Sequence, residues 1–209
     1  TLTGDLAVNG DDITSDGGLT ITPTTDTFFA NGTGVVIGHT AQVTSDTQAF
    51  ESQILGTATA DSGMLIGGFD NGAGAPRIRF LKSRDPAIAD GSFAIVADND
   101  ILGEFDFNPD DGADYATRAA QIHIEVDDAS PEAGGVGTAF VLKQMAGGGT
   151  TAAHETMRIG ANGMMTLGGA VARDSGIILD GNAQDFHIGL DDTADSLVIG
   201  AGTALGTTP

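Results

Sequence analysis

The chain of 209 residues carries 29 Asp or Glu against 8 Lys or Arg, a formal net charge of −21, and it contains 32 Gly and no Cys. The lack of Cys excludes disulfides and Cys-ligated zinc or iron–sulfur sites. A surface this acidic repels phosphate backbones and no apolar run approaches the ~18 residues of a membrane helix, so we expect no nucleic-acid partner and no membrane insertion.

Residues 1–53 alternate short apolar stretches with turn signals and hold no basic residue. Leu6 and Val8 precede an Asn-Gly pair, and Val35 and Ile37 precede another Gly. Glycine and asparagine supply the positive φ angles that tight β-turns require. We therefore expect an N-terminal shaft of β-repeats, which is too thin to cover its own apolar side chains.

Residues 54–169 hold six of the ten Phe, the only Tyr and seven of the eight basic residues. The clearest period-two alternation runs over 122–127, with apolar even positions and polar odd ones, and shorter alternations around 78–80, 93–97 and 105–107 also predict strands. One stretch, 110–120, has alanines at spacings that would suit a short helix or a turn. We expect one compact antiparallel β domain here.

Residues 170–209 return to thin repeats that end in Ile-Gly, as in 186–189 and 197–200, and we expect a C-terminal β-repeat segment. Strand units this short cannot bury an apolar face alone, so several chains should intertwine and cover one another. The pattern itself does not choose between two and three copies. The fold class expected is an all-β, elongated fibre that flanks one compact domain.

The sequence offers little evidence for catalytic, cofactor or metal chemistry. The four histidines, at 39, 123, 154 and 187, lack metal-ligand spacing and are expected to face solvent along strands. Paired carboxylates could hydrolyse glycosides, but no pattern among 29 acids selects a pair. We therefore expect no enzyme, no cofactor and no catalytic or metal-binding residues.

Two acidic clusters are the candidates for a cation or a receptor. Asp98 and Asp100 begin like a calcium loop, but the positions that follow do not match an EF-hand. The second cluster groups three carboxylates with the single tyrosine: Asp110, Asp111, Asp114 and Tyr115. Most such runs are solvated loops, so both remain weak candidates.

The few arginines are candidates for structural ion pairs, because arginine binds carboxylates with two parallel hydrogen bonds. They come from one predicted strand and from a later one, with one acidic residue beside the latter: Arg77, Arg79, Arg84, Arg158 and Glu155. We expect these residues to hold strands or chains together, with receptor contact as the alternative.

Several stretches, in this order, resemble a module of bacteriophage tail fibres and related receptor-binding proteins. They are RIRFLKSR over 77–84, DNDILGEFDF over 98–107, AAQIHIEVD over 119–127 and HETMRIG over 154–160. The family pattern would have Arg where Thr156 stands, which puts one expected salt bridge in doubt. The motifs are structural, so no catalytic residue is carried over.

The resemblance implies an elongated homotrimer in the tail of a virion. Its partners would be its own copies, other virion tail proteins, and a glycan or outer-membrane receptor on the bacterial surface. The function implied is structural and adhesive, with loops presented for host attachment. A bacterial trimeric surface adhesin and a polysaccharide-degrading tailspike are the alternatives.

Overall fold

The computed structural model describes residues 35–39, 41–69, 71–86, 93–147, 152–169 and 172–205. Within these ranges the regular structure is β, apart from one 3₁₀ turn, η1 (Thr59–Asp61). An all-β chain built mainly of antiparallel sheets is thereby confirmed. No helix in these ranges is long and apolar enough to cross a membrane. The repeats predicted in residues 1–34 lie outside the described ranges.

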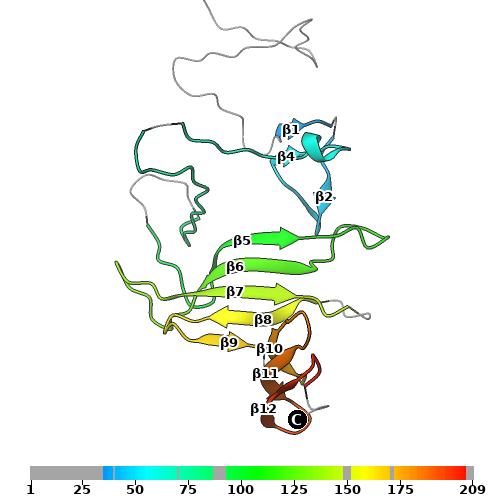
Figure 1. Cartoon of the computed structure of the whole chain (residues 1–209). Coiled ribbons are helices and arrows are strands. Elements are labelled where there is room, and N and C mark those ends of the chain that lie inside the picture. The colour runs from blue at the N-terminus through cyan, green and yellow to red at the C-terminus, as the bar shows by residue number, and fades with distance from the viewer. Residues whose placement is uncertain are drawn as a thin grey trace, which may run out of the picture.

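The strands fall into three units that follow one another along the molecule in sequence order (Figure 1). Their bounds are β1 (Val35–Ile37), β2 (Thr44–Ser45), β3 (Gln48–Ala49), β4 (Ser52–Ile54), β5 (Ile101–Phe107), β6 (Ala120–Val126), β7 (Thr138–Gln144), β8 (His154–Ile159), β9 (Met165–Leu167), β10 (Ser175–Leu179), β11 (Phe186–Asp191) and β12 (Ser196–Ala201). The predicted boundary at 53/54 falls inside β4, and the central sheet spans residues 101–167.

The first unit is small and is stabilised by one buried polar side chain. It pairs β1 in parallel with β4 and forms a hairpin from β2 and β3, whose turn residues Asp46 and Thr47 have positive φ, as a tight hairpin requires. The Gln53 amide accepts a hydrogen bond from the Val43 N–H (2.8 Å) and donates one to the Val43 carbonyl (2.9 Å). These contacts replace the apolar core that so short a unit lacks.

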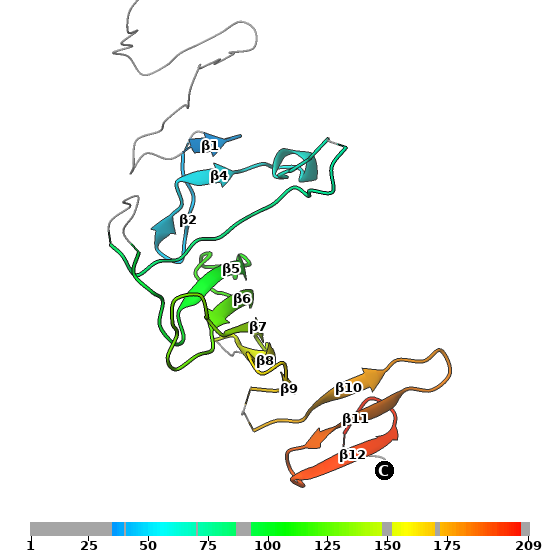
Figure 2. The ribbon, with the colours of Figure 1, turned by 90° about the vertical axis from the view of Figure 1, so that its left-hand side faces the viewer.

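The second unit is a five-stranded antiparallel sheet in the order β5-β6-β7-β8-β9. Consecutive strands are neighbours throughout, as in a meander, because strands that follow one another in sequence tend to pair. Figure 2 shows the sheet nearly edge-on as a single layer, and no other described strand packs on either face. Its two faces differ in the side chains that the alternation gives them, and Ile78 and Phe80 of an extended segment lie over one of them.

One face of this sheet is apolar and half open. The cross-strand register places large apolar side chains in rows, and several of these are more than one-third exposed: Phe105, Phe107, Ile124, Ile159 and Met165. Among the described residues, the fully buried apolar side chains are few and small: Val96, Val126, Ala139 and Val141. The sheet thus has no thick core of its own.

The opposite, polar face is the better buried one in the isolated chain. His123 is 1% exposed, and Gln121 on the same strand is 2% exposed. Long charged side chains cross this face and cover them, as described below. The expectation that His123 faces solvent is therefore wrong, because its strand neighbours cover it.

The third unit is a three-stranded antiparallel sheet of β10, β11 and β12. One face is almost entirely apolar and 40–73% exposed at seven large side chains: Ile177, Leu179, Phe186, Ile188, Leu190, Leu197 and Ile199. On the other face Leu205 folds back over Gly176 and Gly189. His187, also expected in solvent, is buried there at 2% exposure, because the Gly202 carbonyl returns to within 3.0 Å of its Nδ1.

One sequence-based expectation for regular structure differs from the fold, and another is narrowed by it. Residues 77–80 and 93–97 show alternation but form no described strand. Residues 77–80 make no backbone hydrogen bond with a described residue, and 93–97 make isolated ones only, such as that from the Arg84 N–H to the Ala94 carbonyl (3.3 Å). For residues 110–120 the sequence leaves a short helix and a turn open; residues 110–119 form no helix, since three aspartates there accept hydrogen bonds from local backbone N–H groups.

Candidate functional site

The first acidic cluster forms a tight turn that leads into β5. Asp100 accepts two hydrogen bonds from the Arg84 guanidinium (2.7 and 2.8 Å) and one from the Ala97 N–H (3.0 Å). These bonds hold the pKa of the Asp100 carboxyl well below its usual value, with the Arg84 hydrogen bond as the largest cause. Asp98 accepts the Asp128 N–H (3.1 Å). The carboxylates are thus engaged within the chain.

The second acidic cluster caps its own loop. Asp110 accepts the Gly112 N–H and Asp114 accepts the Ala116 N–H. Asp111 accepts two backbone N–H groups and the Thr117 hydroxyl (2.6 Å), and that hydroxyl is the main cause of the lowered pKa of the Asp111 carboxyl. Within the described ranges, no group of three or more His, Cys, Asp or Glu has the geometry to hold a metal ion.

Tyr115 closes this loop beside a hollow. The hollow has a volume of about 490 Å³ and lies between the first unit and the acidic loop, where Tyr115 meets His39, Ser62, Asn108 and Leu55. The Tyr115 carbonyl is held by the Ser45 hydroxyl and the Asn108 amide, both at 3.0 Å. A half-exposed aromatic ring beside polar groups suits a sugar ring, which offers both apolar and hydroxyl faces.

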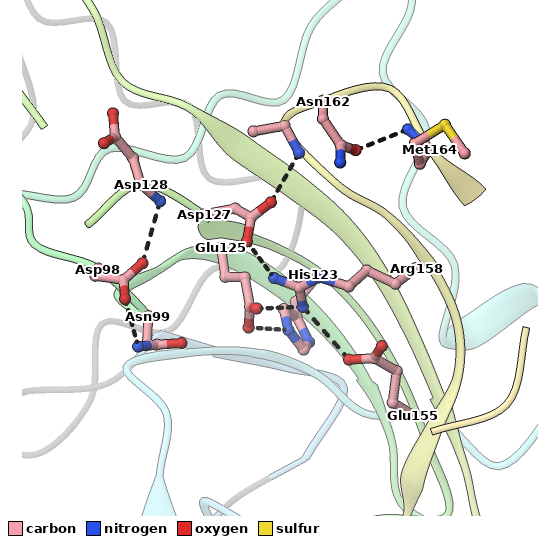
Figure 3. Close-up of polar contacts among 11 residues, drawn as sticks. Asp98, Asn99, His123, Glu125, Asp127, Asp128, Glu155, Arg158, Asn162 and Met164 are labelled. Atoms are coloured by element: carbon pink, nitrogen blue, oxygen red, sulfur yellow. Dashed lines mark hydrogen bonds and ion pairs between the residues drawn. The ribbon is translucent and has the colours of Figure 1, made fainter. Parts of the chain in front are cut away.

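The main polar cluster lies on the polar face of the central sheet (Figure 3). Arg158 on β8 reaches across β7 to Glu125 on β6, and its other nitrogen donates to Asp127 at 2.9 Å. Glu155 lies 3.4 Å from the same guanidinium. Because the side chain spans three strands, its aliphatic stem covers the middle strand, where Val141 is fully buried.

A β-bulge makes part of this cluster possible. Lys143 pairs with Glu155 and Leu142 pairs with Met157, so Thr156 is the extra residue in β8. In a regular strand, positions 155 and 158 are three residues apart and would lie on opposite faces of the sheet; the bulge at Thr156 brings them to the same face. The Thr156 hydroxyl donates to the Leu142 carbonyl (3.2 Å). Thr156 thus occupies the bulge.

Electrostatic effects in this cluster oppose one another. Burial disfavours the charged form of Glu125, but hydrogen bonds from Arg158 and His123 outweigh it and lower the pKa of that carboxyl. The pKa of the Asp127 carboxyl is lowered first by the Ala161 N–H and then by Arg158. Burial also disfavours charged Arg158, yet the carboxylates raise the pKa of its guanidinium. The cluster is therefore a charged, hydrogen-bonded clamp.

Sequence reasoning selected Arg158 and Glu155 but missed their main partners. Glu125 and Asp127 stand in the strand with the clearest alternation, and their polar parity was the only available signal. His123 lies 3.0 Å from Glu125 through its Nε2, and no described group contacts its Nδ1. Arg118, also missed, joins Asp46 of the first unit to Asp106 of β5, each at 3.2 Å.

Of the five residues predicted to form ion pairs, three do so in the structure and two do not. Arg84, Glu155 and Arg158 take part in the contacts above. Arg77 and Arg79 are exposed and form no ion pair with any described residue, so their expected role between strands or chains stays a prediction. Comparison of the chain with family models and with curated proteins gives no significant match.

We predict that replacing Arg158 with Met lowers the free energy of unfolding at pH 7 by about 2 kcal/mol, because the Glu125 carboxylate, 13% exposed, loses its cation. The lowered pKa values of Glu125 and Asp127 mean that the native protein loses stability as the pH falls below about 4, where these groups take up protons. The Met variant should show a weaker acid dependence. Urea unfolding at one fixed protein concentration, from pH 7 to pH 2.5, measures both effects.

The matched control is Arg118→Met, which removes a more exposed pair of contacts, with the Arg118 side chain 40% exposed. Exposed ion pairs contribute at most about 1 kcal/mol, so this variant should unfold nearly like the native protein. Equal losses in the two variants, or an unchanged acid dependence in Arg158→Met, would show that the clamp does not stabilise the sheet.

Proposed function

We propose that this chain is a structural and adhesive subunit of an elongated homotrimer, a tail fibre or tail-tip component of a bacteriophage that presents loops to the host surface. The observation that supports it is the pair of apolar sheet faces that a single chain leaves open. The viral role and the number three rest on the family resemblance, and the open faces support assembly of several copies.

The energetics favour assembly through these faces. Full burial of a large aliphatic side chain contributes about 1.5–3 kcal/mol, so covering the seven half-exposed side chains of the β10–β12 sheet is worth roughly 7 kcal/mol per chain. The central sheet adds five more such side chains. Association costs about 4–15 kcal/mol, which the two faces together can exceed.

Charge limits this association but does not prevent it. The net charge of −21 on each chain makes copies repel one another. Physiological salt shortens that repulsion to a range of about 8 Å. The Arg158 clamp also keeps three carboxylates on the polar face, away from the apolar side chains that would meet in the assembly.

Adhesion would reside in the loops that the assembled shaft holds in place. The acidic loop and the hollow at Tyr115 form one such surface, with its backbone held by its own carboxylates. Three copies would bind a repetitive bacterial glycan or an outer-membrane receptor with avidity that one copy lacks. Other tail proteins would hold one end of the shaft on the virion.

Replacing Ile177 with Asp should dissociate the assembly, because it places a charge on the face that other copies would cover. Ile178 is the matched control: it is the next residue of β10, is similarly exposed (50% against 42%) and lies on the opposite face. Sedimentation equilibrium should give the mass of three chains for the native protein and for Ile178→Asp, and less for Ile177→Asp. A native monomer would refute the assembly.

The viral role is tested by locating the protein. Antibodies raised against the purified chain should label the tails of virus particles in electron micrographs, and the genes beside its own should encode tail proteins. Labelling of the bacterial envelope in cultures without particles would instead support a cell-surface adhesin and contradict the viral role.

A further inference from the structure

One segment of the chain is extended and lacks backbone partners. Residues 77–82 make no backbone hydrogen bond with another described residue. Ile78 and Phe80 lie over the apolar face of the chain's own central sheet, where they line a groove of about 470 Å³ and the Phe80 ring meets Phe105 edge-on at 5.5 Å. Arg79, between these two residues, also borders the groove, but by alternation the side chains of Arg77 and Arg79 belong to the opposite side of the segment. The segment has the form of a strand without a sheet.

The outer edge of the central sheet at β5 has no neighbouring strand among the described residues. β5 is the terminal strand of that sheet, and no described strand pairs with its outer edge. A hollow of about 840 Å³ runs along this edge, lined by Phe105 and Phe107 of β5 and by Phe50 and Ile54 of the first unit. Open edges of this kind readily accept an extended segment through main-chain hydrogen bonds.

The two unpaired elements carry complementary charges at the same spacing. Glu104 and Asp106 stand two residues apart on β5, on the polar face, as Arg77 and Arg79 do in the segment. Gln121 donates to both carboxylates (2.7 and 2.9 Å), and Glu104 has no cationic partner among the described residues. Opposite charges on neighbouring strands attract, and they also fix which face each strand presents.

We infer that residues 77–82 of one subunit add as a strand to the β5 edge of a neighbouring copy, with Arg77 and Arg79 beside Glu104 and Asp106. The occupant is a second copy because Phe80 holds the segment over its own sheet, where a Cβ on Gly103 would lie 2.6 Å from the Phe80 ring. A segment that lies on top of its own sheet is outside that sheet's plane, so it cannot add to the edge of the same sheet.

The alternation of side chains places both the polar and the apolar side of the added segment against matching side chains of the neighbour. With the arginines beside the neighbour's carboxylates, Ile78 and Phe80 stand on the same side as the neighbour's Phe105 and Phe107. That side faces the apolar surface of the segment's own sheet. One strand addition therefore brings two open apolar faces together, which is the contact that the proposed function requires and on which this inference rests.

The chain contains no Cys, so engineered cysteines report on this contact directly. One set of chains carries Arg77→Cys or Arg79→Cys, and a second, differently tagged set carries Glu104→Cys or Asp106→Cys. The four pairings cover both parallel and antiparallel addition of the segment to β5. Each pair is co-expressed and oxidised. At least one pairing should give a disulfide between differently tagged chains. Lys143→Cys, in the same polar row as Asp106 but on β7, should give none.

The outcomes separate this inference from the proposed assembly, because the mass of each sample is measured beside its cross-linking. Assembled oligomers without any disulfide between chains, or a disulfide that forms only within a chain bearing both cysteines, would overturn the strand exchange and leave the assembly standing. A monomeric native chain would overturn both.

Charge reversal gives a second test that needs no cysteine. Arg77→Glu with Arg79→Glu should raise the concentration for half-assembly at least tenfold, and adding Glu104→Arg with Asp106→Arg should restore it. Absence of rescue in a quadruple variant that keeps its β circular dichroism would contradict the pairing.

Discussion

The constraint on which this structure depends is that each of its sheets has only one layer. A sheet becomes stable in water when another layer covers its apolar face. In the described part of this chain, no second layer covers the central sheet or the β10–β12 sheet, and the fully buried apolar side chains are few. Cover by other copies of the chain is the simplest way to satisfy this requirement.

Three of the scarce cations of this acidic chain lie where parts of it are joined. Arg84 fixes the turn that enters β5, Arg118 joins the first unit to the central sheet, and Arg158 ties three strands together on the polar face. Arg118 and Arg158 each lie between carboxylates that would otherwise repel one another, and Arg84 pairs with Asp100 alone. This polar clamping stabilises the sheet within a chain and leaves its apolar face free for assembly.

Period-two alternation was enough to predict the all-β class and the strands around 105–107 and 122–126, because both depend on local pattern. It could not show which face a single chain buries. His123 and His187 are buried because the side chains of other strands, or a returning loop, cover them. Those contacts are non-local and leave no mark in the spacing of residues.

For the ion pairs, too, the local sequence predicts some features and non-local contacts decide the others. Arg158 stood out because basic residues are rare, whereas its partners depend on strand register and on the bulge at Thr156. Alternation over 77–80 predicted a strand where the isolated chain forms none, since a strand also needs a partner. The inferred exchange between copies would supply that partner.

Oxidation of two adjacent methionines tests the central claim most directly. Met164 and Met165 are similarly exposed in the single chain, at 67% and 54%, but Met165 stands in the apolar row of the central sheet, opposite Ile159. Peroxide converts exposed methionine to its sulfoxide, which mass spectrometry measures at each position. If other copies cover the apolar face, Met165 should oxidise at least several-fold more slowly than Met164. Comparable rates in the native protein would show that the face is open to water.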